Sequence, residues 1–567
     1  MAKARLAVGL AVLVWAILNC AGGGRMSVEP TDLRLKNGVV ERTLPNGLKV
    51  YIKEEHFAPV VAAYLWVRSG SVDELDEEAG LAHVHEHMIF KGTPKRPTGQ
   101  IAREIEGAGG DINAFTSFEH TVYHITIAKR FYPIALDVLA DAVAHASFDE
   151  GELKKELAVI KEELKRSRDN PAYRLQDEMF KLAYRVHPFG RPIIGYERTL
   201  DSFERSDVLQ FFRKQYVAGN MFLVVVGDFK VDEVWAHIER YFSQIPKGEP
   251  QKPEKPIEPQ QTEMRVKIEQ MPISKAYLGL CFHTVGALHR DAPALDLLSV
   301  ILSTGESSRL YNRIKVQKEL MHEVWSYSYT PKDPGLFAVG GTLDPAKLLD
   351  AVRATAKEVF ELTDEHVGRR ELQKAKNQLI SELTFERETV QGQARKLGYY
   401  IDVSGDPYYE ERYIASINAL TSADLLRAAK RYFIPQGASI VVLLPDSEEP
   451  PKIEDIKRAV LDGFRDAGSR SKKLQPIIGR RRRPAPQPAE FATDGGSAIY
   501  ELLEEKGGIT KARLANGITV LFKPNRSVPT FSFRLVARGG LRSETEANQG
   551  ISNLVAEMLV RGTENRS

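Results

Sequence analysis

The feature that most restricts the fold of this sequence is an internal repeat. Residues 44–54 (LPNGLKVYIKE) resemble residues 514–524 (LANGITVLFKP), and residues 80–93 (GLAHVHEHMIFKGT) resemble residues 550–563 (GISNLVAEMLVRGT). Both pairs of segments are separated by the same offset of 470 residues, and this register holds without a gap over about fifty positions. A constant offset indicates a duplicated structural module rather than chance similarity. The chain therefore contains two copies of one module.

The first copy has the pattern of an α+β domain. The expected strands are Leu48–Lys53, Val61–Val67, Thr121–Ile127 and Phe222–Val226, and the clearest expected helix is Glu152–Arg166. Alternation of such segments predicts an antiparallel sheet with helices packed on one face. Further along the chain, the run KAYLGLCFHT and the amphipathic stretch PALDLLSVILS predict a strand and a helix of a second, homologous domain.

Changes in composition set the expected domain boundaries. The segment PKGEPQKPEKPIEPQQ (246–261) is rich in Pro and Lys and is typical of an inter-domain linker. Along the 567 residues we expect a signal segment (1–25), a first domain (37–246), a second homologous domain (262–450), a second linker (451–506) and the start of the second copy (507–567). Because a domain cut at its first helix cannot close its sheet, we expect the second copy to be truncated.

The N-terminal segment has the layout of a secretory signal. Lys3 and Arg5 precede the apolar run Leu6–Leu18, which is too short for a comfortable membrane span, and small residues follow it. Cys20 stands where a bacterial lipoprotein signal carries its lipidated cysteine. Simple cleavage predicts a periplasmic protein, whereas lipidation of Cys20 predicts anchoring to the outer membrane. If translation starts at Met26 instead, the protein is cytoplasmic.

Charge and cysteine content exclude some classes of protein. The chain has 78 basic and 76 acidic residues, a net charge of +2, so nothing points to a nucleic-acid partner. Its two cysteines are Cys20 and Cys281, and the second lies in the strand-like run LGLCF, where we expect a small core residue. Without a disulfide framework, packing has to supply the stability.

Three histidines and one glutamate lie within the five residues HVHEH. Side chains four positions apart lie on one face of a helix, so His83 and His87 can share a Zn²⁺ ion. Glu86 lies to one side of the pair, where it can take a proton from a water molecule. His85 points away from the pair, and we expect it to pack in the core or to face solvent. The alternative is a polar helix face that carries two histidines by chance.

A catalytic zinc ion needs a third protein ligand. The helical stretch GELKKELAVIKEELKRSRDNP offers four glutamates, namely Glu152, Glu156, Glu162 and Glu163. Glu and Lys at this spacing are also typical of a helix face that is simply solvated. Helix geometry alone does not choose among these carboxylates.

Taken together, these segments resemble the pitrilysin family of zinc peptidases, in its bacterial and processing-peptidase-like branch. The motif H-x-x-E-H is that of the inverted zincins. The stretches that carry the resemblance are GLAHVHEHMIFKGT, GGDINAFTSFEHTVYHI, LAVIKEELKRSRDNPAY and GESSRLYNRI. The resemblance covers residues 37–450 as one half of a clamshell, with residues 507–567 as the beginning of the other half.

The resemblance implies a zinc-dependent endopeptidase with one Zn²⁺ per chain. The family's third zinc ligand follows the last motif histidine by 76 residues, which is Glu163 here, and Glu156 would be the family's accessory glutamate. Glu86 would act as general base on the attacking water. A peptide or an unfolded protein would lie as an added strand along the sheet edge NAFTS. The substrate-binding residues implied are Asn113, Ala114, Phe115 and Thr116.

Two departures from the family pattern matter for activity. An arginine and a tyrosine that hold substrate opposite the zinc are replaced by Lys315 and His322, and lysine does not form arginine's bidentate fork. In the second copy, the motif residues are replaced by Asn553, Ala556 and Glu557. The family implies that the first domain is catalytic and that the second domain and the second copy are inactive.

These departures leave three alternatives to an independent peptidase. The chain could be one subunit that takes the Arg/Tyr pair from a second peptidase-like subunit or from a missing C-terminal half; a homodimer is a further possible assembly. It could be a non-catalytic scaffold tethered to a membrane. It could also be a lipoprotein that sequesters zinc.

Overall fold

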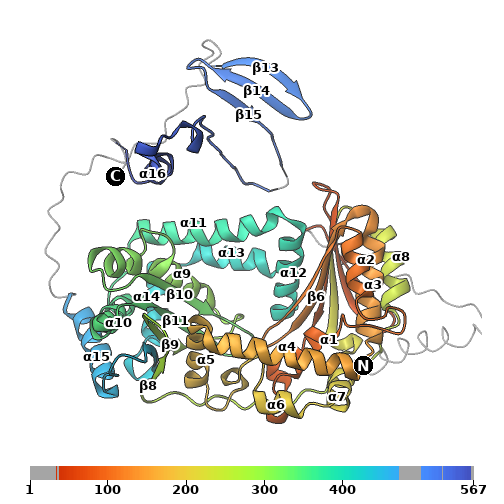
Figure 1. Ribbon diagram of the computed structural model, residues 1–567, viewed down its shortest axis with the longest axis horizontal. Coiled ribbons are helices and arrows are strands. Elements are labelled where there is room, and N and C mark those ends of the chain that lie inside the picture. The colour runs from red at the N-terminus through yellow and green to blue at the C-terminus, as the bar shows by residue number, and fades with distance from the viewer. Residues whose placement is uncertain (1–32, 35–36, 471–499, 527, 564–567) are drawn as a thin grey trace, which may run out of the picture. The chain divides into compact units, whose positions relative to one another are not determined.

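The computed structural model describes residues 33–34, 37–470, 500–526 and 528–563 and divides into two units, residues 1–493 and 494–567 (Figure 1). The expected signal segment, with Cys20, lies outside the described residues. Among the helices that are described, none combines the length and the apolar character that a membrane span requires.

The first domain is built on a seven-stranded sheet in the order β1-β2-β3-β7-β4-β6-β5. The strands are β1 (Leu33–Arg34), β2 (Val39–Thr43), β3 (Lys49–Glu54), β4 (Val60–Val67), β5 (Asp111–Thr116), β6 (Thr121–Ala128) and β7 (Met221–Gly227). All neighbours are antiparallel except β3 and β7. The central strands β4 and β7 are apolar and buried along almost their whole length, whereas β5 forms an edge.

Helices cover one face of this sheet, as predicted. The helices of the first domain are α1 (Leu81–Met88), α2 (Gln100–Gly107), α3 (Tyr132–His145), α4 (Glu150–Asp169), α5 (Pro171–Ala183), α6 (Glu197–Ser202), α7 (Arg205–Gln215) and α8 (Val231–Phe242). Of these, α5 lies elsewhere, against the sheet of the second domain. Apolar side chains of α1, α2, α3, α4, α7 and α8 form one core with β3, β4, β6 and β7. Asn170 ends α4 and caps α5, because its side-chain oxygen accepts hydrogen bonds from the N–H groups of Ala172 and Tyr173.

The second domain repeats this architecture with a five-stranded sheet in the order β10-β11-β9-β12-β8. The strands are β8 (Arg265–Met271), β9 (Ala276–His283), β10 (Glu323–Tyr329), β11 (Leu336–Leu343) and β12 (Ala438–Pro445). The helices are α9 (Ala292–Ser303), α10 (Leu348–Asp364), α11 (Arg369–Phe385), α12 (Val390–Ser404), α13 (Tyr409–Ala419), α14 (Ser422–Tyr432) and α15 (Ile453–Arg470). Cys281 is fully buried in β9, as expected of a core residue.

The prediction of a linker from 451 to 506 is wrong at its beginning, because α15 belongs to the second domain. Ile456, Val460 and Ala467 are buried on one face of α15. Gly463 lies on the same face, and a Cβ there would come within 2.5 Å of the Arg353 carbonyl oxygen of α10. The apolar residues of this helix recur at helical spacing, but they are separated by many charged residues, and the segment was therefore interpreted as a linker. Residues 471–499 of the expected linker lie outside the described part of the chain.

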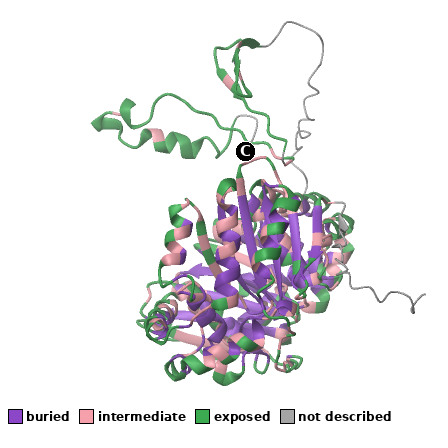
Figure 2. Ribbon diagram, turned by 90° about the vertical axis from the view of Figure 1, so that its right-hand side faces the viewer, coloured by how far each residue is buried: buried purple, intermediate pink, exposed green. Residues whose placement is uncertain are grey.

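Each sheet also buries its second face, against a helix of the other domain. Helix α12 of the second domain packs Ala394 and Ile401 against Trp66 and its neighbours on β4 and β7. Helix α5 of the first domain packs Met179 against Cys281 and its neighbours on β9 and β12. Figure 2 shows the buried strands in the interior of this unit, with the exposed residues on its outside. The two domains therefore share their cores reciprocally.

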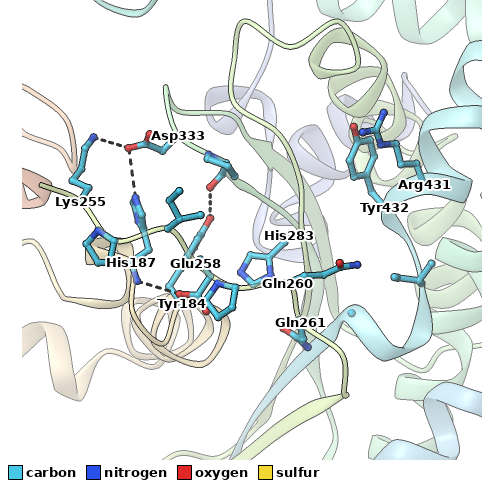
Figure 3. A pocket seen from close by; sticks show the side chains of 16 residues that line it. Tyr184, His187, Lys255, Glu258, Gln260, Gln261, His283, Asp333, Arg431 and Tyr432 are labelled. Atoms are coloured by element: carbon cyan, nitrogen blue, oxygen red, sulfur yellow. Dashed lines mark hydrogen bonds and ion pairs between the residues drawn. The ribbon is translucent and has the colours of Figure 1, made fainter.

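The Pro-rich segment 246–261 contains no helix or strand, but from residue 252 on every third side chain is bound to another part of the chain. The anchored side chains are Lys252, Lys255, Glu258 and Gln261. A spacing of three matches the three-residue turn of a polyproline II helix. Figure 3 shows Lys255 beside Asp333, which also faces His187; the Nζ of Lys255 lies 2.6 Å from the Asp333 carboxylate. We call residues 252–261 the strap.

The second unit repeats the beginning of the first domain. It contains β13 (Tyr500–Lys506), β14 (Ile509–Leu514), β15 (Thr519–Phe522) and α16 (Ile551–Met558). β14, β15 and α16 stand at the offset of 470 residues from β2, β3 and α1. The counterpart of β4 forms no strand, and Phe531 and Phe533 within it are exposed. In the first domain β4 lies between β6 and β7, and the described part of the second unit contains no counterpart of either strand.

Candidate metal-binding active site

Helix α1 begins at a position that only glycine fits. Gly80 has a φ of 107°, and a Cβ there would lie 2.9 Å from the carbonyl oxygen of Ile194. The carboxylate of Glu74 accepts hydrogen bonds from the N–H groups of Gly80 and Ala82, at 3.0 and 2.7 Å, and so serves the first turn of the helix as a cap. Burial raises the pKa of Glu74 to about 8, against the effect of these two donors.

His83 and His87 lie one turn apart on α1 and face Glu163 on α4. The ring centroids of the two histidines are 4.8 Å apart. The Glu163 carboxylate lies 4.0 Å from Nε2 of His83 and 3.6 Å from Nε2 of His87. At these separations, the two Nε2 atoms and one oxygen of Glu163 can all bind the same zinc ion, each at about 2.0–2.2 Å. Among the described residues, His83, His87 and Glu163 form the group of potential ligands whose atoms lie close enough together, within 4.8 Å, to share a metal ion.

The protonation state of His83 also fits a metal ligand. Burial, and then the neighbouring His87, lower the pKa of His83 to about 3. The imidazole is therefore neutral at physiological pH, which is the form that binds metal.

Glu156 lies behind His87 rather than among the three converging ligand atoms. Its carboxylate lies 3.2 Å from Nδ1 of His87 and 2.5 Å from Nζ of Lys91. An Nδ1–H donated to Glu156 leaves Nε2 as the unprotonated nitrogen, and Nε2 is the atom that faces Glu163. The arrangement is that of an outer carboxylate that orients a metal-binding histidine.

Glu86 points into a cavity of about 670 Å³ that it shares with His83 and Glu163. Thr116, the last residue of β5, donates a hydrogen bond of 2.6 Å from its hydroxyl to the Glu86 carboxylate. Burial raises the pKa of Glu86, while the Thr116 hydrogen bond opposes this shift. The candidate base is thus held by the same strand that forms the sheet edge.

The predicted substrate-binding residues Asn113, Ala114, Phe115 and Thr116 all lie on β5, at the edge of the sheet. The side chain of Asn113 accepts a hydrogen bond of 2.8 Å from the Ala114 N–H. That amide therefore points away from β6, toward the open side of the strand. No described strand pairs with this side of β5.

His85 lies in the core and not in the site. Its two ring nitrogens lie 2.7 Å from the Leu81 carbonyl oxygen and 3.0 Å from that of Val208. Burial lowers its pKa to about 4, and aromatic rings of α7, including Phe211, surround it. His85 thus joins α1 to α7, in agreement with the expectation that it packs.

The residues that replace the family's Arg/Tyr pair do not line the cavity around Glu86. Lys315 lies 4.9 Å above the ring of Tyr311, and Nε2 of His322 lies 2.9 Å from the Asp344 carboxylate. Both side chains therefore interact with residues of the second domain, Tyr311 and Asp344.

Sequence reasoning missed Glu74, Lys91 and the role of Thr116. Glu74 could have been found through the repeat, since its counterpart Glu544 accepts the same two hydrogen bonds at the start of α16. Lys91 and Thr116 carry no comparable signal, because their contacts with Glu156 and Glu86 join segments far apart in the chain.

Several known proteins resemble this chain in sequence and in fold. Family models match at residues 49–197, "Insulinase (Peptidase family M16)", and at residues 202–379, "Peptidase M16 inactive domain". An uncharacterized zinc protease of Rickettsia felis is 32% identical over 70% of this chain and 96% of its own. A probable mitochondrial-processing peptidase subunit beta of Arabidopsis thaliana is 28% identical over 72% of this chain and 78% of its own. The crystal structure of a protease from Helicobacter pylori, at 25% identity, matches with a TM-score of 0.68 over 73% of this chain and all of that one.

Proposed function

The chain belongs to peptidase family M16, and we propose that it is a zinc-dependent endopeptidase that cleaves peptides or unfolded polypeptides. Membership of this family confirms the resemblance to pitrilysin-type zinc peptidases that the sequence motifs indicated. The observation that carries the proposal is the convergence of His83, His87 and Glu163 on one point beside Glu86.

Under this proposal, His83, His87 and Glu163 hold one Zn²⁺ ion. A zinc ion there would polarise the scissile carbonyl group and make a water molecule more acidic. Glu86 takes the proton of the attacking water and passes it to the amine that leaves. Thr116 holds the Glu86 carboxylate in position, and Glu156 orients His87.

The substrate class follows from the open edge of β5. A peptide can add to this edge as an extended strand, with affinity from backbone hydrogen bonds that are largely independent of its sequence. Folded proteins seldom offer a free extended segment, so we propose short or unfolded polypeptides as substrates.

The test is the substitution Glu86→Gln, which preserves the shape of the side chain but removes the base. We expect turnover of a fluorogenic peptide to fall at least about 100-fold, since general base catalysis contributes roughly 10²–10⁴-fold. We expect one bound zinc per chain, measured by elemental analysis, in both the wild type and the variant. Unchanged turnover in Glu86→Gln would exclude this mechanism.

The second candidate is a subunit that works with a partner. Lys315 and His322 stand where the family has its Arg/Tyr pair, and one group of relatives consists of mitochondrial-processing peptidase beta subunits. A second peptidase-like subunit would then supply the missing pair, which a second copy of this chain lacks as well. Peptide cleavage that appears only on mixing with such a subunit would favour this candidate. One zinc ion per purified chain would argue against a purely structural scaffold. Rapid turnover of a peptide substrate would argue against a lipoprotein that only sequesters zinc.

We also propose that the protein acts in the periplasm, anchored to the outer membrane if Cys20 is lipidated. The support is the basic and apolar layout of residues 1–25. Mass spectrometry of the mature N-terminus decides between cleavage, lipidation and a start at Met26, which would place the protein in the cytoplasm.

A further inference from the structure

Side chains along β5 alternate between the two faces of the sheet. Thr116 contacts Glu86, and Ala114 packs against the core of the helix-covered face on which α1 lies. Phe115 points to the opposite face, where its ring centroid lies 6.2 Å from that of Trp66. A peptide added to β5 alternates in the same way. Every second side chain of a bound peptide therefore faces away from the metal site.

A cavity of about 540 Å³ lies on that opposite face, and we call it the rear cavity. One wall comes from the sheet and the other from the end of α11 and the start of α12. Its lining residues are Tyr64, Phe115, His124, Phe385, Glu386, Thr389, Gln391, Gly392 and Arg395. Phe115 also lines the cavity that holds Glu86, so the two cavities meet at the edge strand.

The lining of the rear cavity fits an aromatic side chain. Tyr64 and His124 are cross-strand neighbours whose rings stack at 4.5 Å, and Phe385 stands on the opposite wall with more than half of its surface exposed. Offset and edge-to-face ring contacts favour aromatic partners. The charged groups cancel, because Arg395 pairs with Glu386 at 2.9 Å, and the planar guanidinium can in addition stack on a ring.

We propose that the rear cavity selects an aromatic residue of the peptide substrate, at one position near the cleaved bond. This rests on the proposed peptidase function and adds a specificity site to it. Because side chains of an added strand alternate, the two immediate neighbours of the selected residue face the metal side and do not enter the rear cavity.

The experiment uses the zinc-loaded full chain and a set of unstructured peptides, each with a single tyrosine at a different position. Mass spectrometry of the products measures the distance from the tyrosine to the cleaved bond. We expect cuts to cluster at one distance and to be about fivefold faster than in the same peptide without tyrosine, the size of an aromatic contact. Cuts spread evenly over all distances would overturn the proposal.

Gln391→Trp fills the rear cavity from an exposed helical position. We expect this variant to lose the clustering, so that its cuts spread over all distances from the tyrosine. The matched control is Gln210→Trp, an exposed glutamine on α7 that does not line the cavity, which should retain the clustering. Clustering that survives Gln391→Trp contradicts the proposal.

A second readout does not depend on turnover. A peptide that carries benzoylphenylalanine in place of tyrosine is photolabelled onto the Glu86→Gln protein, and we expect the label within residues 385–395. Labels that lie only elsewhere overturn the proposal. If the tyrosine-free peptide is not cleaved by the wild type, the proposed function fails, and the photolabelling still decides on the rear cavity.

Discussion

His83 and His87 lie one turn apart, yet their surroundings prepare them for metal in different ways. His83 is kept neutral by burial, which lowers its pKa to about 3. His87 is less buried and is oriented by a carboxylate, since Glu156 lies 3.2 Å from its Nδ1. Lys91 in turn holds the other oxygen of Glu156. An outer carboxylate of this kind fixes the ring orientation and the tautomer of the ligand.

This arrangement predicts that Glu156→Gln weakens zinc binding. Glutamine can still accept a hydrogen bond from His87, but it loses the charge that stabilises both His87 and the ion pair with Lys91. We expect zinc affinity to fall about 10–100-fold, measured by competition with a chelator. The control is Glu152→Gln, on the same helix, where Glu152 pairs with the exposed Lys155; it should change the affinity less than twofold. Equal affinities in Glu156→Gln and the wild type would exclude the positioning role.

How much of the site the sequence could predict differs from residue to residue. The spacing of His83, Glu86 and His87 predicts their shared position on one helix, because helix periodicity alone fixes it. Glu163 was selected by the family resemblance, since helix geometry alone does not choose among the glutamates of α4. The contact of Thr116 with Glu86 depends on how β5 lies across α1, which no local pattern encodes.

Among the elements, α12 packs closely against the sheet of the other domain. Gly398 lies against the ring of Trp66, and a Cβ at this position would come within 2.2 Å of the indole nitrogen. Gly398→Ala gains up to about 1 kcal/mol of helix propensity but overpacks a buried ring. We expect a net loss of about 2 kcal/mol in the free energy of unfolding, measured with urea. An increase in stability would contradict the close packing of α12 on β4.

The matched control for this substitution is Gly107→Ala at the end of α2. A Cβ on residue 107 would have no atom of the described chain within 4 Å, so alanine meets open space there. We expect this variant to be as stable as the wild type or more stable by up to about 1 kcal/mol.

The strap makes a second prediction at this scale. One oxygen of Glu258 accepts hydrogen bonds from three successive N–H groups, those of residues 185–187, at 2.9–3.1 Å. Glu258→Gln weakens these charge-assisted bonds, and we expect a loss of about 1–3 kcal/mol and faster proteolysis of the strap. Glu254→Gln, in the same strap but exposed, should stay within about 0.5 kcal/mol of the wild type. Equal effects of the two substitutions would show that the strap is not anchored through Glu258.

The elements that the sequence failed to predict share a physical reason. The strap carries no apolar period, because its anchors are polar side chains whose partners lie in both domains. Its composition is typical of a linker, but composition does not predict the polar contacts that hold it. Helix α15 was missed because the face buried against α10 includes Ala467 and Gly463, which add little to an apolar pattern.

For the whole first unit, the two domains are joined by polar contacts as well as by shared cores. Asp402 on α12 is fully buried and lies 3.1 Å from Nδ1 of His120, which follows the edge strand β5. It also lies 2.8 Å from Nζ of Lys332 and 3.5 Å from Nε of Arg68. Three cationic or donor groups from both domains thus meet at one carboxylate. Asp402 thereby couples the segment that follows the edge strand to the second domain.

This coupling predicts how the stability of the first unit depends on pH. Burial alone would raise the pKa of Asp402, but the His120 hydrogen bond and the charge of Lys332 lower it from 3.8 to about 2. Because the folded-state pKa lies below the ordinary value, the stabilisation is complete above about pH 4 and is lost as the pH falls toward 2. A shift of this size corresponds to roughly 2 kcal/mol at neutral pH.

We expect Asp402→Asn to lower the free energy of unfolding by at least that amount at pH 7, with a difference from the wild type that shrinks below pH 4. The control is Asp350→Asn, at an exposed position on α10, which should show no such difference. Urea unfolding of the three proteins from pH 7 to pH 3 measures the effect, and a deficit in Asp402→Asn that stays constant across this range would contradict the role of the Asp402 charge.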